Sequence, residues 1–238
     1  MKLLILTQYF PPEVGAPQNR LLELGVRLSR EGVNVSALTA MPNYPQMEIH
    51  SDYKKKAYLK EKIDDITVYR SFIYVSKSKG IIARLLNYFS FVVSSLLFGL
   101  FELPKFDVIL CESPPLFLGI SGKILAFFKK SKFIFNVSDL WPESAEKLEI
   151  VTNKTFLGMA TILEEWLYKS SDLVTGQTQG IVADIKHRFP EKKVYWLPNG
   201  VDIDYYNPEK INSNWRVENG FEQDDLLFLY AGIIGYAQ

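Results

Sequence analysis

Short apolar runs alternate with longer, helix-like stretches along most of the chain, and this alternation limits the possible folds more than any other feature. A short apolar run bounded by turn residues is typical of a buried strand, and a longer periodic stretch is typical of a helix. The predicted strands are Lys2–Leu6, Val33–Thr39, Ile66–Phe72, Asp107–Cys111, Lys132–Val137, Leu173–Gly176, Lys193–Leu197 and Leu226–Ala231. The predicted helices are Pro17–Glu31, Ile81–Glu102, Leu116–Lys129, Lys154–Ser170 and Ile181–Arg188. Because the strands are apolar on both faces, we expect an α/β fold with a parallel sheet and helices on both of its faces.

Composition excludes several classes of protein. With 47% hydrophobic and 23% charged residues, the 238-residue chain has enough apolar side chains for a packed core. Its 27 basic residues balance its 27 acidic ones, so no nucleic-acid partner is expected. The single cysteine, Cys111, excludes a disulfide framework and is expected in the core. The apolar run Met1–Leu6 is too short for a secretory signal, which favours a cytoplasmic protein.

Two segments interrupt the alternation of strands and helices. Residues 40–64 hold few apolar side chains and several lysines, and we expect a long, basic, partly helical insertion there. After Leu197 the chain continues through a polar stretch to the last predicted strand and reaches Gln238 without a further helix. We therefore expect residues 1–200 to form one domain and residues 201–238 to form a linker and the first strand of a truncated second domain.

Three motifs occur in a characteristic order. Residues 8–17 (QYFPPEVGAP) follow the first predicted strand, residues 139–144 (DLWPES) follow a central strand, and residues 198–202 (PNGVD) lie at the expected domain boundary. Together they resemble the amino-terminal half of the family-four glycosyltransferases of GT-B architecture. The similarity is greatest to the branch that builds O-antigen, capsule and colanic-acid polysaccharides in bacteria.

This resemblance implies two Rossmann-like domains that face each other across a cleft. The second domain would hold most of the nucleotide-sugar donor, which we expect to be UDP-linked, and residues 1–200 would bind the acceptor. The family's reaction needs no metal or other cofactor and retains the configuration of the anomeric carbon. The implied acceptor is a polyprenyl-diphosphate-linked saccharide at the inner face of the cytoplasmic membrane. The chain by itself would then be inactive.

Gly15 and Ala16 are the expected phosphate-binding residues. They lie between the first predicted strand and the first predicted helix, at the sheet edge where α/β proteins bind ligands. A glycine lets the backbone approach a phosphate, and the start of the helix offers unpaired N–H groups. By resemblance this loop contacts the diphosphate or the reacting sugar of the donor. The alternative is a turn glycine without a ligand.

Ser138 and Asp139 end a central predicted strand, and we expect them to be catalytic. A carboxylate there can orient an acceptor hydroxyl or accept its proton, although Asp139 is equally suited to cap a helix that begins near Pro142. We assign acceptor binding to Arg20, Glu143 and Thr178, while Glu143 also suits a first helical turn and Thr178 also suits a helix cap.

Asn199 and Gly200 form the expected hinge between the domains. Asn-Gly is a strong turn signal, and in the family this dipeptide marks the interdomain hinge. A glycine there can absorb the dihedral changes of domain closure. A plain turn with no hinge function would explain the dipeptide equally well.

The predicted helix after residue 80 is also a candidate for membrane contact. Residues 85–101 carry no charge, which is close to the lower limit for spanning a bilayer. The preceding segment, from Tyr53 to Arg84, holds nine basic residues against three acidic ones. A basic flank beside an apolar helix suits anionic lipid, so we expect peripheral membrane contact. A buried helix with a solvated lysine face is the alternative.

Two other functions fit these observations less well. In the first, the chain would be a non-catalytic acceptor-binding subunit that needs a separate donor domain. In the second, it would be an enzyme that acts on the nucleotide-sugar itself, such as an epimerase. An apolar, basic face gives no advantage to an enzyme with a soluble sugar substrate, and this favours transfer to a lipid-linked acceptor.

Overall fold

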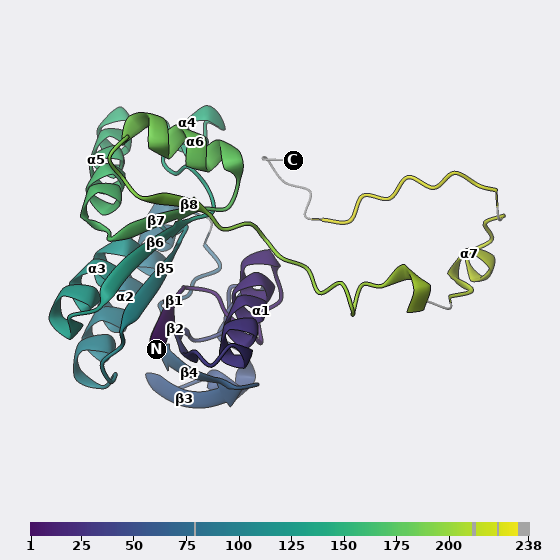
Figure 1. Ribbon diagram of the computed structural model, residues 1–238, viewed down its shortest axis with the longest axis horizontal. Helices are drawn as coiled ribbons and strands as arrows, with labels where there is room; N and C mark the ends of the chain where they lie inside the picture. Colours follow the sequence, from purple (N-terminus) through teal and green to yellow (C-terminus); the bar gives the residue numbers. More distant parts are fainter. Residues whose placement is uncertain (79, 211–212, 223, 233–238) are drawn as a thin grey trace. The chain divides into compact units, whose positions relative to one another are not determined.

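The computed structural model describes residues 1–78, 80–210, 213–222 and 224–232. Its internal contacts divide the chain into two units, Met1–Asn199 and Gly200–Gln238. The first unit is built on one eight-stranded sheet with the order β3-β4-β2-β1-β5-β6-β7-β8 (Figure 1). Every neighbouring pair is parallel except β3 and β4, which are antiparallel. The α/β fold predicted from the alternating pattern is therefore confirmed.

The strands of the sheet are β1 (Lys2–Leu6), β2 (Asn34–Ala40), β3 (Tyr58–Ile63), β4 (Ile66–Ser71), β5 (Val108–Ser113), β6 (Lys132–Val137), β7 (Leu173–Gly176) and β8 (Val194–Trp196). The α-helices are α1 (Ala16–Arg30), α2 (Ile81–Phe101), α3 (Leu118–Lys129), α4 (Glu143–Lys147), α5 (Lys154–Ser170), α6 (Gln179–Arg188) and α7 (Trp215–Glu218). Two short 3₁₀ turns are formed by η1 (Ser51–Tyr53) and η2 (Pro208–Lys210).

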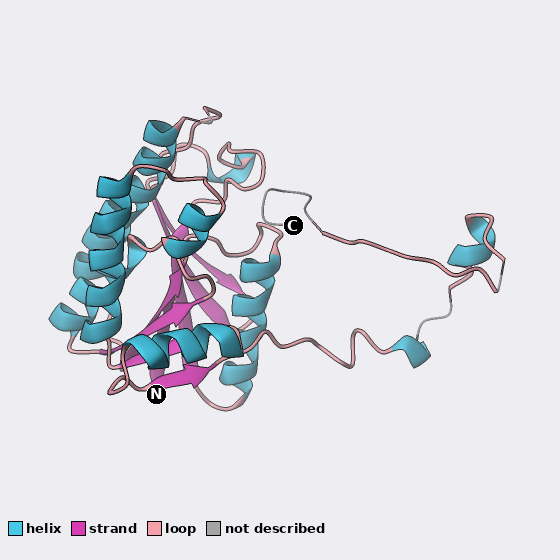
Figure 2. Ribbon diagram, turned by 90° about the horizontal axis from the view of Figure 1, so that it is seen from above, coloured by secondary structure: helices cyan, strands magenta, loops and turns pink. Residues whose placement is uncertain are grey.

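Helices cover both faces of the sheet, and the strands are apolar on both faces for this reason. In β1, Leu4 and Leu6 belong to one buried cluster, whereas Leu3 and Ile5 belong to the other. The first cluster includes side chains of α2, α3, α5 and α6, and the second includes Leu21 of α1. Figures 1 and 2 show α1 across the sheet from α2, α3 and α5. Alternate side chains of a strand point to opposite faces, so two covered faces favour apolar side chains at successive positions.

The parallel pairing brings the ends of four strands to one edge of the sheet. Leu6 of β1 pairs with Cys111 of β5, Cys111 pairs with Phe135 of β6, and Phe135 pairs with Val174 of β7. Cys111 is fully buried, as predicted. Since all four strands run in the same direction, the segments that follow them meet at the carboxyl edge, where α/β proteins bind ligands.

The prediction for residues 40–64 was largely wrong, because the main element there is the edge strand β3. The only helical piece is the short turn η1. In β3 the half-buried Leu59, Glu61 and Ile63 alternate with exposed residues, which is the period of a strand with one covered face. The polar Glu61 interrupts the apolar side of the pattern, and it is retained there because it pairs with the buried Arg70 of β4.

Leu226–Ala231 does not form the predicted strand. A strand needs a neighbouring strand to bond its backbone N–H and C=O groups, and the described residues supply none to this segment. Its side chains are accordingly exposed, as for Phe228 at 91%. The residues predicted to continue this segment, Ile233–Gln238, lie outside the described part of the chain. The truncated second domain therefore stays a prediction.

Candidate functional site

The loop that follows β1 is held in place by a buried carboxylate. Glu13 is 2% exposed and accepts hydrogen bonds from the backbone N–H groups of Phe10 (3.3 Å), Asn43 (2.7 Å) and Tyr44 (2.8 Å). Burial raises the pKa of Glu13, and the three N–H donors act in the opposite direction. Glu13 thereby ties the loop after β1 to the loop after β2.

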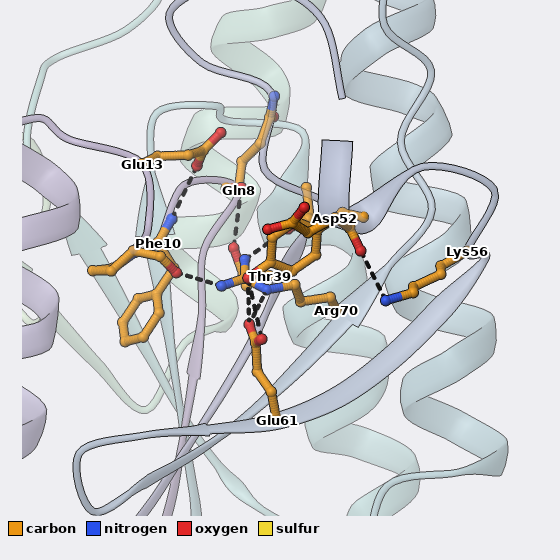
Figure 3. A network of polar contacts seen from close by, with 11 residues as sticks. Gln8, Phe10, Glu13, Thr39, Asp52, Lys56, Glu61 and Arg70 are labelled. Atoms are coloured by element: carbon orange, nitrogen blue, oxygen red, sulfur yellow. Dashed lines mark hydrogen bonds and ion pairs between the residues drawn. The ribbon is translucent and has the colours of Figure 1, made fainter. Parts of the chain in front are cut away.

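A buried arginine supports the same loop from the other side (Figure 3). The Arg70 guanidinium is fully buried and donates to the carbonyl oxygens of Pro11 and Ala40 and to the Glu61 carboxylate. Its carbon Cζ lies 5.1 Å from the ring centre of Tyr53. The edge strand β3 therefore supplies the counter-charge for an arginine that fixes the backbone of the loop after β1.

Gly15 occupies the N-cap position of α1, where that loop ends. Its backbone is extended (φ 174°, ψ 168°), a conformation that any residue adopts. A Cβ at this position would lie 2.5 Å from Oε1 of Gln18, a buried side-chain atom with no hydrogen-bond partner among the described residues. Gly15 has no side chain to cap the helix, and Ala16 is exposed at its first position. The missing Cβ thus makes room for the Gln18 side chain, and the phosphate-binding role of both residues stays a prediction.

Glu112, at the end of β5, gathers polar side chains from three other elements. Its carboxylate is 2% exposed, and its Oε1 accepts hydrogen bonds from the Arg20 guanidinium of α1 and from the Ser138 hydroxyl that follows β6. Its Oε2 accepts from Nδ2 of Asn136 (2.5 Å), whose Oδ1 accepts from the Thr175 hydroxyl (2.6 Å). We call these five residues the Glu112 cluster.

The Glu112 cluster brings together two residues that were predicted separately, Arg20 and Ser138. Sequence reasoning missed Glu112 itself, although a signal was present, since an acidic residue directly follows the predicted strand Asp107–Cys111. A charged side chain at the carboxyl end of a central parallel strand lies at the ligand-binding edge. Being buried, it also needs a partner of opposite charge, which is Arg20.

Asp139 and Glu143 follow Ser138 in the sequence, and both are more exposed than Glu112. Oδ2 of Asp139 accepts a hydrogen bond from the Ser144 hydroxyl at 2.8 Å. No side chain accepts a hydrogen bond at the N-cap of α4, so the alternative of Asp139 as its backbone cap is not what the structure shows. Glu143 pairs with Lys147, one turn further along α4. The roles of both acids toward a substrate stay predictions.

Thr178 is the N-cap of α6, and its Oγ1 accepts a hydrogen bond from the backbone N–H of Ile181 at 3.1 Å. The capping alternative is therefore confirmed, and acceptor binding by Thr178 stays a prediction. Asn199 and Gly200 are exposed and stand where the two units meet in the sequence. Within the described residues no group of three or more His, Cys, Asp or Glu side chains is placed to hold a metal ion.

A family model described as Glycosyltransferase Family 4 matches residues 18–205, which include the whole Glu112 cluster. The chain belongs to glycosyltransferase family 4. The family resemblance seen in the three motifs is thereby confirmed. A curated relative of this family-4 chain is the colanic acid biosynthesis glycosyl transferase WcaI of Escherichia coli K12, which is 30% identical over 141 residues. That alignment covers 58% of this chain and 34% of WcaI, so the chain spans about a third of the relative's length.

Three solved structures illustrate the proteins that share this fold. The match to sucrose-phosphate synthase of Thermosynechococcus elongatus has a TM-score of 0.64 at 12% identity. It covers 94% of this chain and 53% of the synthase chain. Starch synthase IV of Arabidopsis thaliana, bound to ADP and acarbose, has a TM-score of 0.55 at 16% identity, with coverages of 87% and 53%. Anabaena Alr3699/HepE with UDP has a TM-score of 0.53 at 17% identity, with coverages of 92% and 50%. These likenesses confirm the Rossmann-like fold.

Proposed function

We propose that this family-4 chain is the acceptor-side domain of a retaining glycosyltransferase that acts in bacterial surface polysaccharide synthesis, of the O-antigen, lipopolysaccharide or colanic-acid type. The enzyme moves a sugar from a nucleotide-sugar to a lipid-linked saccharide, and the chain by itself is inactive. The observation that carries the proposal is the family match over residues 18–205, because the matched region contains the Glu112 cluster at the carboxyl edge of the sheet.

The donor in this proposal is a UDP-linked sugar. Support comes from relatives of the same fold that were solved with UDP or ADP. In this chain α1 begins with Gly15 as its N-cap and Ala16 as its first residue, at the carboxyl edge of the sheet. The positive end of a helix dipole attracts phosphate. No metal is required in the proposal, since the amino-terminal end of α1 supplies positive charge at the diphosphate.

The transfer follows from these positions. The oxygen of the acceptor hydroxyl bonds to the anomeric carbon, and the bond from that carbon to the diphosphate oxygen breaks. The nucleoside diphosphate leaves with the bonding electrons, and the hydroxyl proton passes to the exposed Asp139 carboxylate. Catalysis then depends mainly on positioning and on charge stabilisation at the diphosphate. The Glu112 cluster holds Arg20 and Ser138 next to this reaction.

The acceptor is a polyprenyl-diphosphate-linked saccharide, and the enzyme lies at the inner face of the cytoplasmic membrane. The similarity to WcaI supports a polysaccharide acceptor. Residues Ile82–Phe101 of α2 are long and apolar enough to cross a membrane by length and composition, with a mean hydropathy of 1.5. Six large apolar side chains along α2, spaced by three or four residues, are exposed, and we call them the α2 stripe: Ile82, Leu86, Phe89, Val93, Leu97 and Phe101.

The neighbouring helices α3 and α5 also carry exposed apolar side chains. Phe127 and Phe128 of α3 are 75% and 64% exposed, and Met159, Ile162 and Trp166 of α5 are exposed as well. These helices cover the same face of the sheet as α2 (Figure 2). Exposed apolar side chains gathered on one face are typical of a surface that contacts a partner or a membrane. The α2 stripe therefore supports peripheral contact of one face of α2 with the membrane, and not the alternative of a fully buried helix.

Removing the α2 stripe should weaken membrane binding. Phe89→Ser, Val93→Ser and Leu97→Ser together remove three apolar side chains that we expect to enter the lipid. The complete enzyme should then partition into phosphatidylglycerol vesicles at least about tenfold less, measured by co-sedimentation at low salt. Tyr195→Ser is the control, because Tyr195 is 62% exposed on β8 and does not belong to the stripe. Equal sedimentation of the triple variant and the wild type would contradict membrane contact through α2.

The transfer itself is tested with radiolabelled UDP-sugars and undecaprenyl-diphosphate saccharides. The complete enzyme should move the label into the lipid fraction, with the anomeric configuration of the donor retained in the product. Asp139→Ala should lower kcat by about tenfold or more, because the carboxylate proposed to accept the hydroxyl proton is lost. Glu165→Ala, which removes an exposed acid that pairs with Lys169, is the control. Label that stays in water-soluble products would refute a lipid-linked acceptor.

A further inference from the structure

A cavity of about 300 Å³ lies beside the first turns of α2. Tyr9 comes from the loop after β1, Tyr44 from the loop after β2, and Lys77 from the segment between β4 and α2. Arg84, Asn87 and Tyr88 of α2 complete the principal lining. We call this cavity the tyrosine pocket. It is separate from the Glu112 cluster in its residues, although Tyr9 follows β1 at the same carboxyl edge.

The three tyrosines give the pocket walls that suit a sugar ring. The rings of Tyr9 and Tyr44 meet edge to face, with their centres 5.8 Å apart. Burial raises the pKa of Tyr9, and the nearby Tyr88, Glu13 and Tyr44 raise it further. Burial likewise raises the pKa of Tyr88. The hydroxyl groups of Tyr9 and Tyr88 therefore stay protonated and can donate hydrogen bonds to sugar oxygens, while the ring faces cover apolar C–H surface.

A buried glutamine holds two of the lining side chains in place. Gln8 is 1% exposed, and its Nε2 donates to the Tyr9 hydroxyl (3.2 Å) and to Oδ1 of Asn87 (2.9 Å). Nδ2 of Asn87 donates in turn to the carbonyl oxygen of Tyr74 at 2.7 Å. Oε1 of Gln8 is buried and has no hydrogen-bond partner among the described residues. The Gln8 amide thus pre-organises the pocket, with hydrogen bonds from its nitrogen and none to its oxygen among the described residues.

The charge at the pocket is positive. Lys77 and Arg84 line it, and no aspartate or glutamate is among the lining residues in the described part of the chain. The Arg84 side chain is exposed and forms no hydrogen bond or ion pair with the described residues, whereas the Lys77 ammonium shares the Glu48 carboxylate with Lys54. An arginine with free N–H donors beside a cavity suits a phosphate, which it can bind through two parallel hydrogen bonds. Ser76 and Ser78 add hydroxyl donors to the same lining.

We propose that the tyrosine pocket binds the diphosphate-linked sugar at the head of an isoprenoid acceptor. The phosphates lie against Arg84 and Lys77, and the first sugar lies between the tyrosine rings. This choice of ligand rests on the proposed function, which names a lipid-linked acceptor. The position of the α2 stripe on the same helix supports it, because one helix then carries the membrane contact along its outer face and the head-group site beside its first turns.

The test measures binding without turnover, with farnesyl diphosphate as the probe. Arg84→Gln in the complete enzyme should raise the Kd of farnesyl diphosphate by about tenfold, since a charge-assisted contact is lost. Ala83→Trp should abolish binding, because Ala83 lines the cavity and the indole ring would fill it. Both variants should bind UDP as the wild type does. Arg30→Gln, which removes an exposed arginine at the far end of α1, is the matched control and should change neither Kd.

Three outcomes would overturn the assignment of the pocket. The first is a wild type that does not bind farnesyl diphosphate, and the second is a pair of variants that bind it as tightly as the wild type. The third is an Arg84→Gln variant that loses phosphatidylglycerol vesicles but keeps farnesyl diphosphate, because Arg84 would then contact lipid head groups only. None of these measurements uses a donor sugar. A failed transfer assay with intact farnesyl diphosphate binding would instead refute the proposed function and leave the pocket assignment standing.

Discussion

Replacing Glu112 with glutamine is expected to lower kcat of the complete enzyme by about 100-fold, because small displacements of positioned groups are costly to catalysis. Glutamine keeps the size of the side chain but turns one acceptor oxygen into an N–H donor. That donor would face Nδ2 of Asn136, which is itself a donor. Turning the Asn136 amide over would restore that contact, with the Thr175 hydroxyl then accepting a hydrogen bond where it donates one now. The neutral amide can no longer hold the Arg20 guanidinium by charge, so Arg20 and Ser138 are expected to move.

The same substitution removes the counter-charge of a nearly buried arginine. The Arg20 side chain is 10% exposed and has Glu112 as its ion-pair partner. Breaking one side of a buried pair typically costs about 3 kcal/mol or more of unfolding free energy. The measurements are steady-state kinetics and urea unfolding, with Glu23→Gln on the exposed side of α1 as the control. A kcat within twofold of the wild type would show that the Glu112 cluster has only a structural role.

Replacing Arg70 with methionine is expected to lower the free energy of unfolding by about 3–5 kcal/mol. Methionine fills much of the volume but leaves the carbonyl oxygens of Pro11 and Ala40 without the arginine, and it leaves the Glu61 carboxylate unpaired. The loop after β1 should then lose its support from β4. Urea unfolding of the complete enzyme, followed by circular dichroism, measures the change.

Two further variants make the Arg70 prediction specific. Arg30→Met removes an exposed arginine and should change the free energy of unfolding by less than about 0.5 kcal/mol. Adding Glu61→Leu to Arg70→Met should recover part of the loss, because the unpaired carboxylate is then gone. A loss below about 1 kcal/mol for Arg70→Met would mean that the buried pair contributes little to the fold.

The sequence pattern predicts two kinds of element well: strands that are buried on both faces, and helices that bury one clear apolar face. The central strands read as continuous apolar runs, and the helices read as longer periodic stretches, so their bounds differ from the predicted ones by at most two residues. The strand that pattern missed is one whose pairing is polar. The strand β3 carries Glu61 on its covered face, and only the position of Arg70 in the neighbouring strand explains why.

The candidate site divides in the same way. The sequence alone indicated that residues after β1 and β6 lie at a ligand-binding edge, because the alternation of strands and helices predicts strands that run in the same direction. It did not indicate that Arg20 and Ser138 share one carboxylate. Glu112 lies 92 residues from Arg20 and 26 residues from Ser138 along the chain, and nothing local to any of the three encodes that contact.

The sequence by itself determined the fold class, the family and the sheet edge where chemistry is expected, since each depends on local periodicity or on short motifs. The tertiary structure alone decided which polar side chains meet at that edge. It also decided which face of α2 is exposed and that Tyr9, Tyr44 and Tyr88 enclose one pocket. The physical reason is that the burial and the pairing of a side chain depend on segments that packing brings together. The sequence of one segment does not specify which other segments pack against it.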